Sequence, residues 1–153
     1  MKKIFYSLLW STFAVYCLAL VWLLFLCRTT SPMSISEYFR TVANFVPLRT
    51  ITRYITIYSY GYISLSIINL VGNFLLFLPM GAMLPCILKK LDRFYKIVII
   101  ITAMVLIVEI LQGIFRVGTP DIDDLILNLT GAMFGYAITK LPFVNKAIKK
   151  ISE

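Results

Sequence analysis

The chain has 153 residues, of which 60% are hydrophobic, and its mean hydropathy is +0.89. Both values lie far above those of a water-soluble globular domain. The absence of histidine excludes histidine-based catalytic triads and histidine metal sites. The formal net charge of +8 requires no nucleic-acid partner, because anionic lipid at a membrane surface is sufficient to explain it. The composition therefore predicts an all-α, polytopic membrane protein with a single domain over residues 1–153.

Four apolar stretches are predicted to cross the lipid bilayer as helices. A hydrocarbon core of about 30 Å needs about 20 helical residues at a rise of about 1.5 Å each. The stretches are residues 4–27, a segment within 54–88, residues 97–115 and residues 125–139. The first is too long for the apolar region of a typical signal peptide and has no Ala-x-Ala cleavage signal, so we interpret it as an uncleaved anchor.

Basic residues predict the orientation of these spans. Lysines precede the first span, lie between the second and third, and follow the fourth. The positive-inside rule places all three groups in the cytoplasm. We therefore expect a multi-pass protein of the cell membrane, with both termini cytoplasmic and with residues 28–62 and 116–124 facing outward.

The first outward segment is predicted to contain a short helix that lies in the outer membrane interface. Ser34 and Glu37 have the spacing of a capping box. Apolar residues follow at helical intervals as far as Phe45, and Pro47 is expected to end the helix.

Polar side chains recur in the outer halves of the second and third spans. Asn69 and Asn73 are four residues apart and share one face of a helix. Glu109 lies roughly 9 Å below the outer end of the third span, with Gln112 one turn above it. A charged residue in a span costs about 2.5–3.5 kcal/mol on insertion scales measured for other side chains. We therefore expect Glu109 to be either protonated or paired with an arginine.

The outward segments contain arginine but no lysine. Arginine can bind phosphate or carboxylate through two parallel hydrogen bonds, or can anchor a helix end at lipid headgroups. Anchoring is the favoured interpretation for Arg28 and Arg53, which lie next to span boundaries. Both interpretations stay open for Arg49 and Arg116, which are the candidate partners of Glu109.

The fourth span carries one stripe of polar and small residues. Thr119 is expected to cap this helix, with Pro120 at its first position. The stripe then contains Asp121, Asp124, Asn128, Gly131 and Gly135, at intervals of three and four. The Gly-x-x-x-Gly spacing allows close helix approach in lipid, so the stripe is predicted to face the other spans.

Three spans thus direct polar groups toward one another, which predicts a single pocket open to the outside. Each amide could instead hydrogen-bond between helices, and each aspartate could instead stabilise a helix N-terminus. Their joint occurrence favours the pocket. The candidate site residues are Arg49, Asn69, Asn73, Glu109, Gln112, Arg116, Asp121, Asp123, Asp124 and Asn128.

Four segments between residues 44 and 135 form a recognisable set of motifs. They are Asn44-Phe45-Val46-Pro47-Leu48-Arg49-Thr50, Asn69-x-x-Gly72-Asn73-x-x-x-Phe77-x-Pro79-x-Gly81, Glu109-x-x-Gln112, and Asp121-Ile122-Asp123-Asp124-Leu125-Ile126-x-Asn128-x-x-Gly131-x-x-x-Gly135. Together they resemble the VanZ-like membrane family. Leu48 stands where an aromatic residue is more usual. The family's namesake is associated with resistance to teicoplanin-type glycopeptide antibiotics, whose targets lie outside the membrane. An outward-facing site with arginines and carboxylates fits a ligand in that compartment.

Three functions are compatible with these patterns. The first is a non-catalytic binding or accessory role in glycopeptide resistance or cell-envelope homeostasis, with a glycopeptide antibiotic or a lipid-linked cell-wall precursor as partner. The second is an intramembrane enzyme that acts on a lipid-linked phosphate or cell-wall precursor, with carboxylates as acid, base or metal ligands. The third is a small transporter that works as a homo-oligomer. The absence of polar residues from the inner half of the predicted spans argues against it. No nucleophile motif is recognisable, so we favour the first function, with no cofactor and no resident metal.

Overall fold

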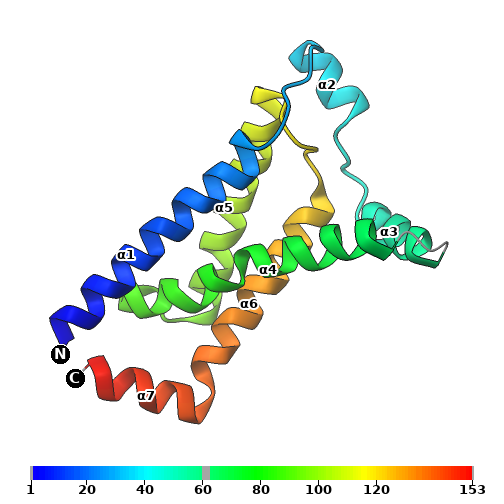
Figure 1. Ribbon diagram of the computed structural model, residues 1–153. Coiled ribbons are helices and arrows are strands. Elements are labelled where there is room, and N and C mark those ends of the chain that lie inside the picture. Colours follow the sequence, from blue (N-terminus) through cyan, green and yellow to red (C-terminus); the bar gives the residue numbers. More distant parts are fainter. Residues whose placement is uncertain (1, 60–62, 153) are drawn as a thin grey trace.

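The computed structural model describes residues 2–59 and 63–152, with side chains described for 2–57 and 67–150. Within these residues every regular element is a helix (Figure 1). In chain order they are α1 (Lys2–Val21), a π-helical extension of it (Trp22–Leu26), α2 (Ile35–Thr41), α3 (Arg49–Ser59), α4 (Ile63–Ile87), the 3-10 helix η2 (Lys89–Leu91), α5 (Phe94–Phe115), α6 (Ile122–Lys140) and α7 (Pro142–Ser152).

Three helices of the described chain are long and apolar enough to cross a membrane. They cover Lys2–Leu26, Ile67–Ile87 and Phe94–Phe115, which confirms helices at the first three predicted spans. The fourth predicted span falls on α6, which has two aspartates in its first turn and is not one of these three. The all-helical fold is therefore established, and three of its helices have the character of membrane spans.

The predicted N-cap of α2 at Ser34 is confirmed, but the predicted extent of the helix is wrong. The side-chain oxygen of Ser34 accepts a hydrogen bond from the backbone N–H of Glu37 at 3.3 Å. The helix then ends at Thr41 and not at Pro47. The reason is tertiary: the backbone N–H of Asn44 donates to the carbonyl of Pro120, so the chain is extended there.

The same contact shifts the start of α6. Its N-cap is Asp121 and its first residue is Ile122, so the prediction that Thr119 caps the helix is wrong. The N–H of Ile122 donates to the carbonyl of Asn44 at 3.0 Å, which completes a short parallel pairing with Asn44. Because of this pairing, two extended segments run side by side from the α2 end of the molecule to the starts of α3 and α6 (Figure 1).

Helices α4 and α6 cross at very short distance, as the Gly-x-x-x-Gly spacing predicts. A Cβ atom on Gly131 would lie 1.8 Å from the carbonyl oxygen of Phe74, and one on Gly135 would lie 2.0 Å from that of Leu78. The α4 backbone therefore occupies the space that a side chain would need. This crossing brings the N-terminal half of α4 against the first turns of α6 and determines where the polar residues of both helices meet.

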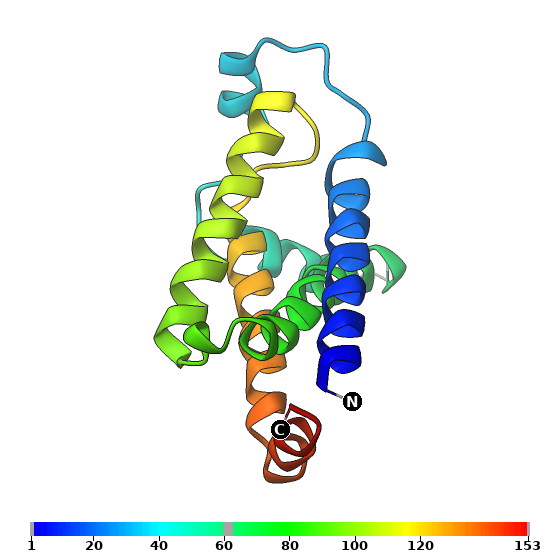
Figure 2. The ribbon, with the colours of Figure 1, turned by 90° about the vertical axis from the view of Figure 1, so that its left-hand side faces the viewer.

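The hydrophobic core lies between α4, α5 and α6, and α1 packs against it. Its most deeply buried members include Phe77, Met80, Ile97, Ile101 and Val105. In two perpendicular views the N- and C-termini lie at the end of the molecule opposite α2 (Figures 1 and 2). The loop between α4 and α5 is also found toward that end, so the basic residues of all three predicted cytoplasmic groups share one side of the molecule.

Candidate functional site

Asp123 joins α6 to the start of α3 and is completely buried, with 0% of its surface exposed. One carboxylate oxygen accepts the backbone N–H of Leu48 at 2.5 Å. The other accepts the N–H groups of Thr50 and Ile51 at 2.7 and 3.1 Å. The first N–H groups of a helix have no partner within the helix, and its dipole favours an anion there. Asp123 provides α3 with both an acceptor for its first N–H groups and a negative charge at its N-terminus. Its carboxylate is therefore occupied by hydrogen bonds within the protein.

Asp121 connects the same segments by a second set of bonds. One of its carboxylate oxygens accepts the side-chain amide of Asn44 and the backbone N–H of Asp123, both at 2.9 Å. Its other oxygen accepts the hydroxyl of Thr50 at 2.5 Å. Its backbone N–H donates to the carboxylate of Glu109 at 2.9 Å. Asp121 and Asp123 therefore form the centre of a hydrogen-bonded junction between residues 44–51, α5 and α6, which we call the carboxylate junction.

The carboxylate junction holds one residue in a strained conformation. Leu48 has a φ angle of +64°, in the left-handed region, although it is not glycine. This conformation costs about 1–2 kcal/mol for a residue with a Cβ atom. The bond from its N–H group to Asp123 holds it there. Strain of this kind persists only where surrounding contacts over-determine the backbone.

A polar cavity of about 170 Å³ opens beside the carboxylate junction. Four predicted site residues line it: Asn69, Asn73, Asp121 and Asp124. The amide of Asn73 donates to a carboxylate oxygen of Asp124 at 2.5 Å, across the α4–α6 crossing. The cavity thus unites the polar residues of two helices that the sequence assigned to one pocket.

Sequence reasoning missed several residues of this cavity. Arg28 follows the first span, and Arg53 and Tyr54 lie on α3; the remaining two are Thr50 and Thr119. Both arginines had been interpreted as lipid anchors. Helix α3 was not predicted, so the position of Arg53 in the cavity lining could not be inferred. The sequence signal that could have indicated it is the motif at residues 44–50, which leads directly into α3.

Glu109 lies on the other side of the junction. It lines a neighbouring hollow of about 120 Å³ whose other walls are mainly apolar, including Phe39 and Leu125. Of the two alternatives predicted for Glu109, pairing with Arg116 or Arg49 is not observed within the described chain, and protonation stays a prediction. A side-chain nitrogen of Arg116 donates to the carbonyl of Met33 at 2.8 Å, and Arg49 is exposed outside the cavity.

Two further predicted residues are buried away from the cavity lining. Gln112 is 3% exposed, and its amide donates to the carbonyl of Leu24 at 3.0 Å, which ties α5 to the end of the first span. Asn128 is 4% exposed on the inward stripe of α6. The residues that the sequence assigned to one pocket therefore lie in three places, which are the carboxylate junction, the polar cavity and buried positions outside both.

The chemistry of the polar cavity follows from its side chains. Arg28 and Arg53 provide planar groups of donors that match phosphate or carboxylate oxygens. Asp124 provides an acceptor for amine, amide or hydroxyl donors, and Asn69 and Asn73 carry amides that both donate and accept. Such a lining matches a ligand with both anionic and hydrogen-bonding groups. Within the described residues, no group of three or more cysteines, aspartates and glutamates is arranged to hold a metal ion.

Comparison with known proteins agrees with the motifs. The family model described as VanZ/LLP1 matches residues 13–144. The chain is also similar to Protein VanZ of Enterococcus faecium, with 24% identity over 138 residues that cover 90% of this chain and 77% of that protein. No solved structure matches the chain. The family match covers most of the sequence, including all four motif segments, and the chain belongs to the VanZ/LLP1 family.

Proposed function

We propose that the protein crosses the cell membrane four times, with α6 as the fourth span and both termini in the cytoplasm. Two features support this topology. Both termini lie at one end of the molecule, and α2 lies at the other (Figure 2). The polar backbone of the two extended segments that lead to α3 and α6 is compatible with membrane depth, because non-helical backbone is tolerated where it lines a polar cavity.

We further propose a non-catalytic accessory role at the cell envelope, in teicoplanin-type glycopeptide resistance or in envelope homeostasis. In this role the polar cavity faces outward and binds a polar group of a glycopeptide or of a lipid-linked cell-wall precursor. The observation that carries the proposal is the joint presence of Arg28, Arg53 and Asp124 in one cavity. The bonding of Asp121 and Asp123 within the carboxylate junction supports binding over acid–base catalysis, because both carboxylates already accept several hydrogen bonds.

The test is teicoplanin susceptibility in a sensitive Gram-positive host that expresses the full chain. We expect the wild-type protein to raise the inhibitory concentration above that of the empty vector, and Arg53→Gln and Asp124→Asn to remove the increase. Arg49→Gln is the matched control: it removes the same charge from α3, but Arg49 does not line the cavity. Immunoblots of membrane fractions establish that all variants accumulate equally.

Two outcomes would contradict the proposal. Equal teicoplanin susceptibility of cells with wild-type protein and of cells with vector would contradict the resistance role. An equal loss of resistance with Arg49→Gln and with Arg53→Gln would contradict binding in the polar cavity. Mass spectrometry of lipid-linked precursors from the same cells addresses the enzymatic alternative, since a new or depleted species that depends on Asp124 would assign catalysis.

A further inference from the structure

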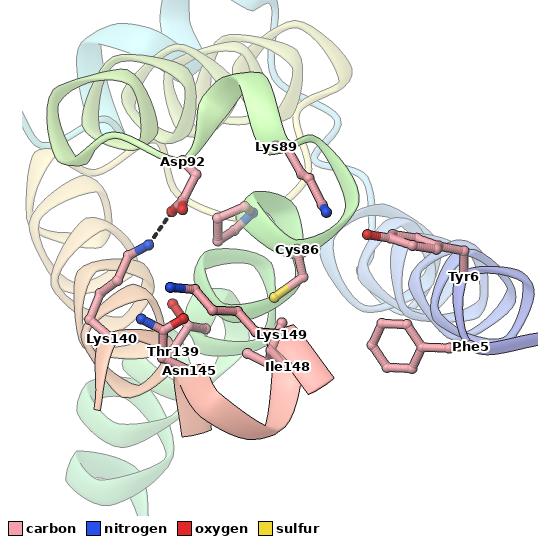
Figure 3. A pocket seen from close by; sticks show the side chains of 11 residues that line it. Phe5, Tyr6, Cys86, Lys89, Asp92, Thr139, Lys140, Asn145, Ile148 and Lys149 are labelled. Atoms are coloured by element: carbon pink, nitrogen blue, oxygen red, sulfur yellow. Dashed lines mark hydrogen bonds and ion pairs between the residues drawn. The ribbon is translucent and has the colours of Figure 1, made fainter. Parts of the chain in front are cut away.

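A second cavity lies at the opposite end of the molecule, near both termini. It has a volume of about 190 Å³, and its walls come from α1, α4, η2, α6 and α7 (Figure 3). None of its lining residues belongs to the outer polar cavity. It is therefore a separate site, and we call it the terminal-side cavity.

The terminal-side cavity has an excess of positive charge. Lys89 of η2, Lys140 at the end of α6 and Lys149 of α7 line it, together with the carboxylate of Asp92, so the described lining residues have a formal net charge of +2. Lys140 forms an ion pair with Asp92. In Figure 3 a dashed line joins Lys140 to Asp92, and the nitrogen of Lys149 lies on the same side of the cavity as Lys140. Lysines from three separate elements thus line a space where the described residues include one acidic group.

Lys89 approaches the cavity from the opposite side. Its ammonium nitrogen lies 6.0 Å from the centre of the Tyr6 ring, which fixes it across from Lys140 and Lys149 (Figure 3). A cation over an aromatic ring keeps its charge and its hydrogen-bond donors available to an anion. An anion in the cavity would therefore be met by ammonium groups from two sides.

The remaining wall is apolar and is completed by an amphipathic helix. Phe5 and Ile148 line the cavity beside Tyr6. In α7 the apolar residues Val144, Ala147 and Ile148 recur at intervals of three and four, and its lysines alternate with them. A short helix with this pattern is typical of the membrane–water interface, where its apolar side enters the lipid and its lysines remain in the headgroup layer. The cavity then lies at the depth of the lipid phosphates.

We propose that the terminal-side cavity binds the phosphate group of an anionic phospholipid from the adjacent leaflet. The ammonium groups act as point charges on the phosphate oxygens, and the apolar wall contacts the first part of the lipid tail. This site is independent of the function proposed for the outer cavity. A soluble phosphate has the same anionic group but no apolar part that would contact the apolar wall.

The experiment compares two double variants of the full-length protein in detergent. Lys89→Gln with Lys149→Gln removes two lysines that line the cavity. Lys90→Gln with Lys150→Gln removes their sequence neighbours on the same two elements, neither of which lines it. Both variants lose the same charge from the same end of the molecule, so general attraction to an anionic surface falls equally in both.

Native mass spectrometry then measures retention of dioleoylphosphatidylglycerol, with dioleoylphosphatidylcholine as the zwitterionic comparison. We expect wild-type protein and the control variant to retain phosphatidylglycerol preferentially, and the Lys89/Lys149 variant to bind it about tenfold more weakly. Equal weakening in both variants, or no weakening in either, would overturn the site. Melting curves in sodium phosphate and in sodium chloride of equal ionic strength form the second arm. Stabilisation by inorganic phosphate that depends on Lys89 and Lys149, without lipid retention, would overturn the assignment to a lipid.

Discussion

Asp123 and Asp124 are neighbours in the sequence but belong to different parts of the molecule. Asp123 is completely buried, and both its oxygens accept backbone N–H groups from the region around the start of α3. Asp124 lines the polar cavity and accepts a side-chain amide from α4. Successive residues of a helix point about 100° apart, so the first turn of α6 directs one carboxylate toward α3 and the next toward α4. Two adjacent acidic residues can therefore differ completely in whether a ligand can reach them.

The largest expected effect comes from neutralising the buried member of this pair. Asp123→Asn replaces one accepting oxygen by an amide that is itself a donor, so at least one of the N–H groups of Leu48, Thr50 and Ile51 loses its acceptor. We expect a loss of roughly 3 kcal/mol in the free energy of unfolding, since hydrogen bonds to charged groups are the strong ones. Asp124→Asn should cost about 1 kcal/mol or less. Denaturant titration in mixed micelles measures both, and equal losses would contradict the division between junction and cavity.

A slightly smaller effect is expected at the crossing that brings Asp124 to Asn73. Gly131→Ala places a methyl group against the carbonyl oxygen of Phe74, so α4 and α6 must separate. We expect a loss of about 2 kcal/mol, which is typical of overpacking. Gly72→Ala is the matched control, because a Cβ atom there has no other atom within 4 Å. Gly72→Ala should leave the free energy of unfolding unchanged or raise it. The same denaturant titration compares the two variants, and a larger loss with Gly72→Ala than with Gly131→Ala would contradict the close crossing.

A gain in stability is expected where the carboxylate junction strains the backbone. Leu48→Gly removes the Cβ atom that opposes the left-handed conformation, while the N–H bond to Asp123 is kept. Because Leu48 is 54% exposed, little burial is lost. Glycine also loses more backbone entropy on folding, about 0.5–1 kcal/mol, so relief of about 1–2 kcal/mol of strain leaves an expected net gain of up to about 1 kcal/mol. Val46→Gly, at an exposed neighbour that is not in the left-handed region, should instead lower stability. Thermal melting in detergent compares the two, and a lower melting temperature for Leu48→Gly would argue against strain at this position.

The smallest effect concerns Asp92, an exposed carboxylate that contrasts with Asp123. Burial alone lowers the pKa of Lys140, but the hydrogen bond and charge of Asp92, together with the neighbouring Tyr136, raise the pKa above its ordinary value. The pair therefore stabilises the fold at pH values below the ordinary lysine pKa and loses this contribution as pH rises through the raised pKa. The side chains are 39% and 42% exposed, so solvent screening limits the effect to about 1 kcal/mol or less.

The measurement for this pair is the difference in unfolding free energy between wild-type protein and Asp92→Asn. The difference should be present at about pH 8 and should shrink at about pH 11, where Lys140 loses its proton. A difference that grows with rising pH would contradict the ion pair as its source.

Much of the helical framework could be predicted because its signals are local. The apolar stretches set three long helices, Ser34 and Glu37 set the start of α2, and the glycines of α6 indicate a close crossing. Each of these features depends on side-chain chemistry within a few turns of one helix. The four motif segments also led to the correct family.

The candidate site could be predicted only in part. Asn69, Asn73, Asp121 and Asp124 do line one cavity, but Glu109 faces an apolar hollow, and Arg28 and Arg53 enter the lining unexpectedly. Helix α3 and the early end of α2 were also missed. The end of α2 and the start of α3 flank the contact of residues 44–51 with 121–123, which are at least 70 positions apart in the chain. A contact between such distant residues has no signal in the local sequence.

The sequence by itself determined that the chain is helical and that its long apolar stretches are suited to lipid. It also indicated that acidic and amide groups from several helices lie near one another. Tertiary structure decided which of those groups satisfy the backbone and which line a cavity. The physical reason is that the residue type alone does not reveal whether a carboxylate accepts backbone N–H groups or lines a cavity. Only the fold determines where unpaired helix N–H groups lie, and Asp123, unlike Asp124, lies next to them.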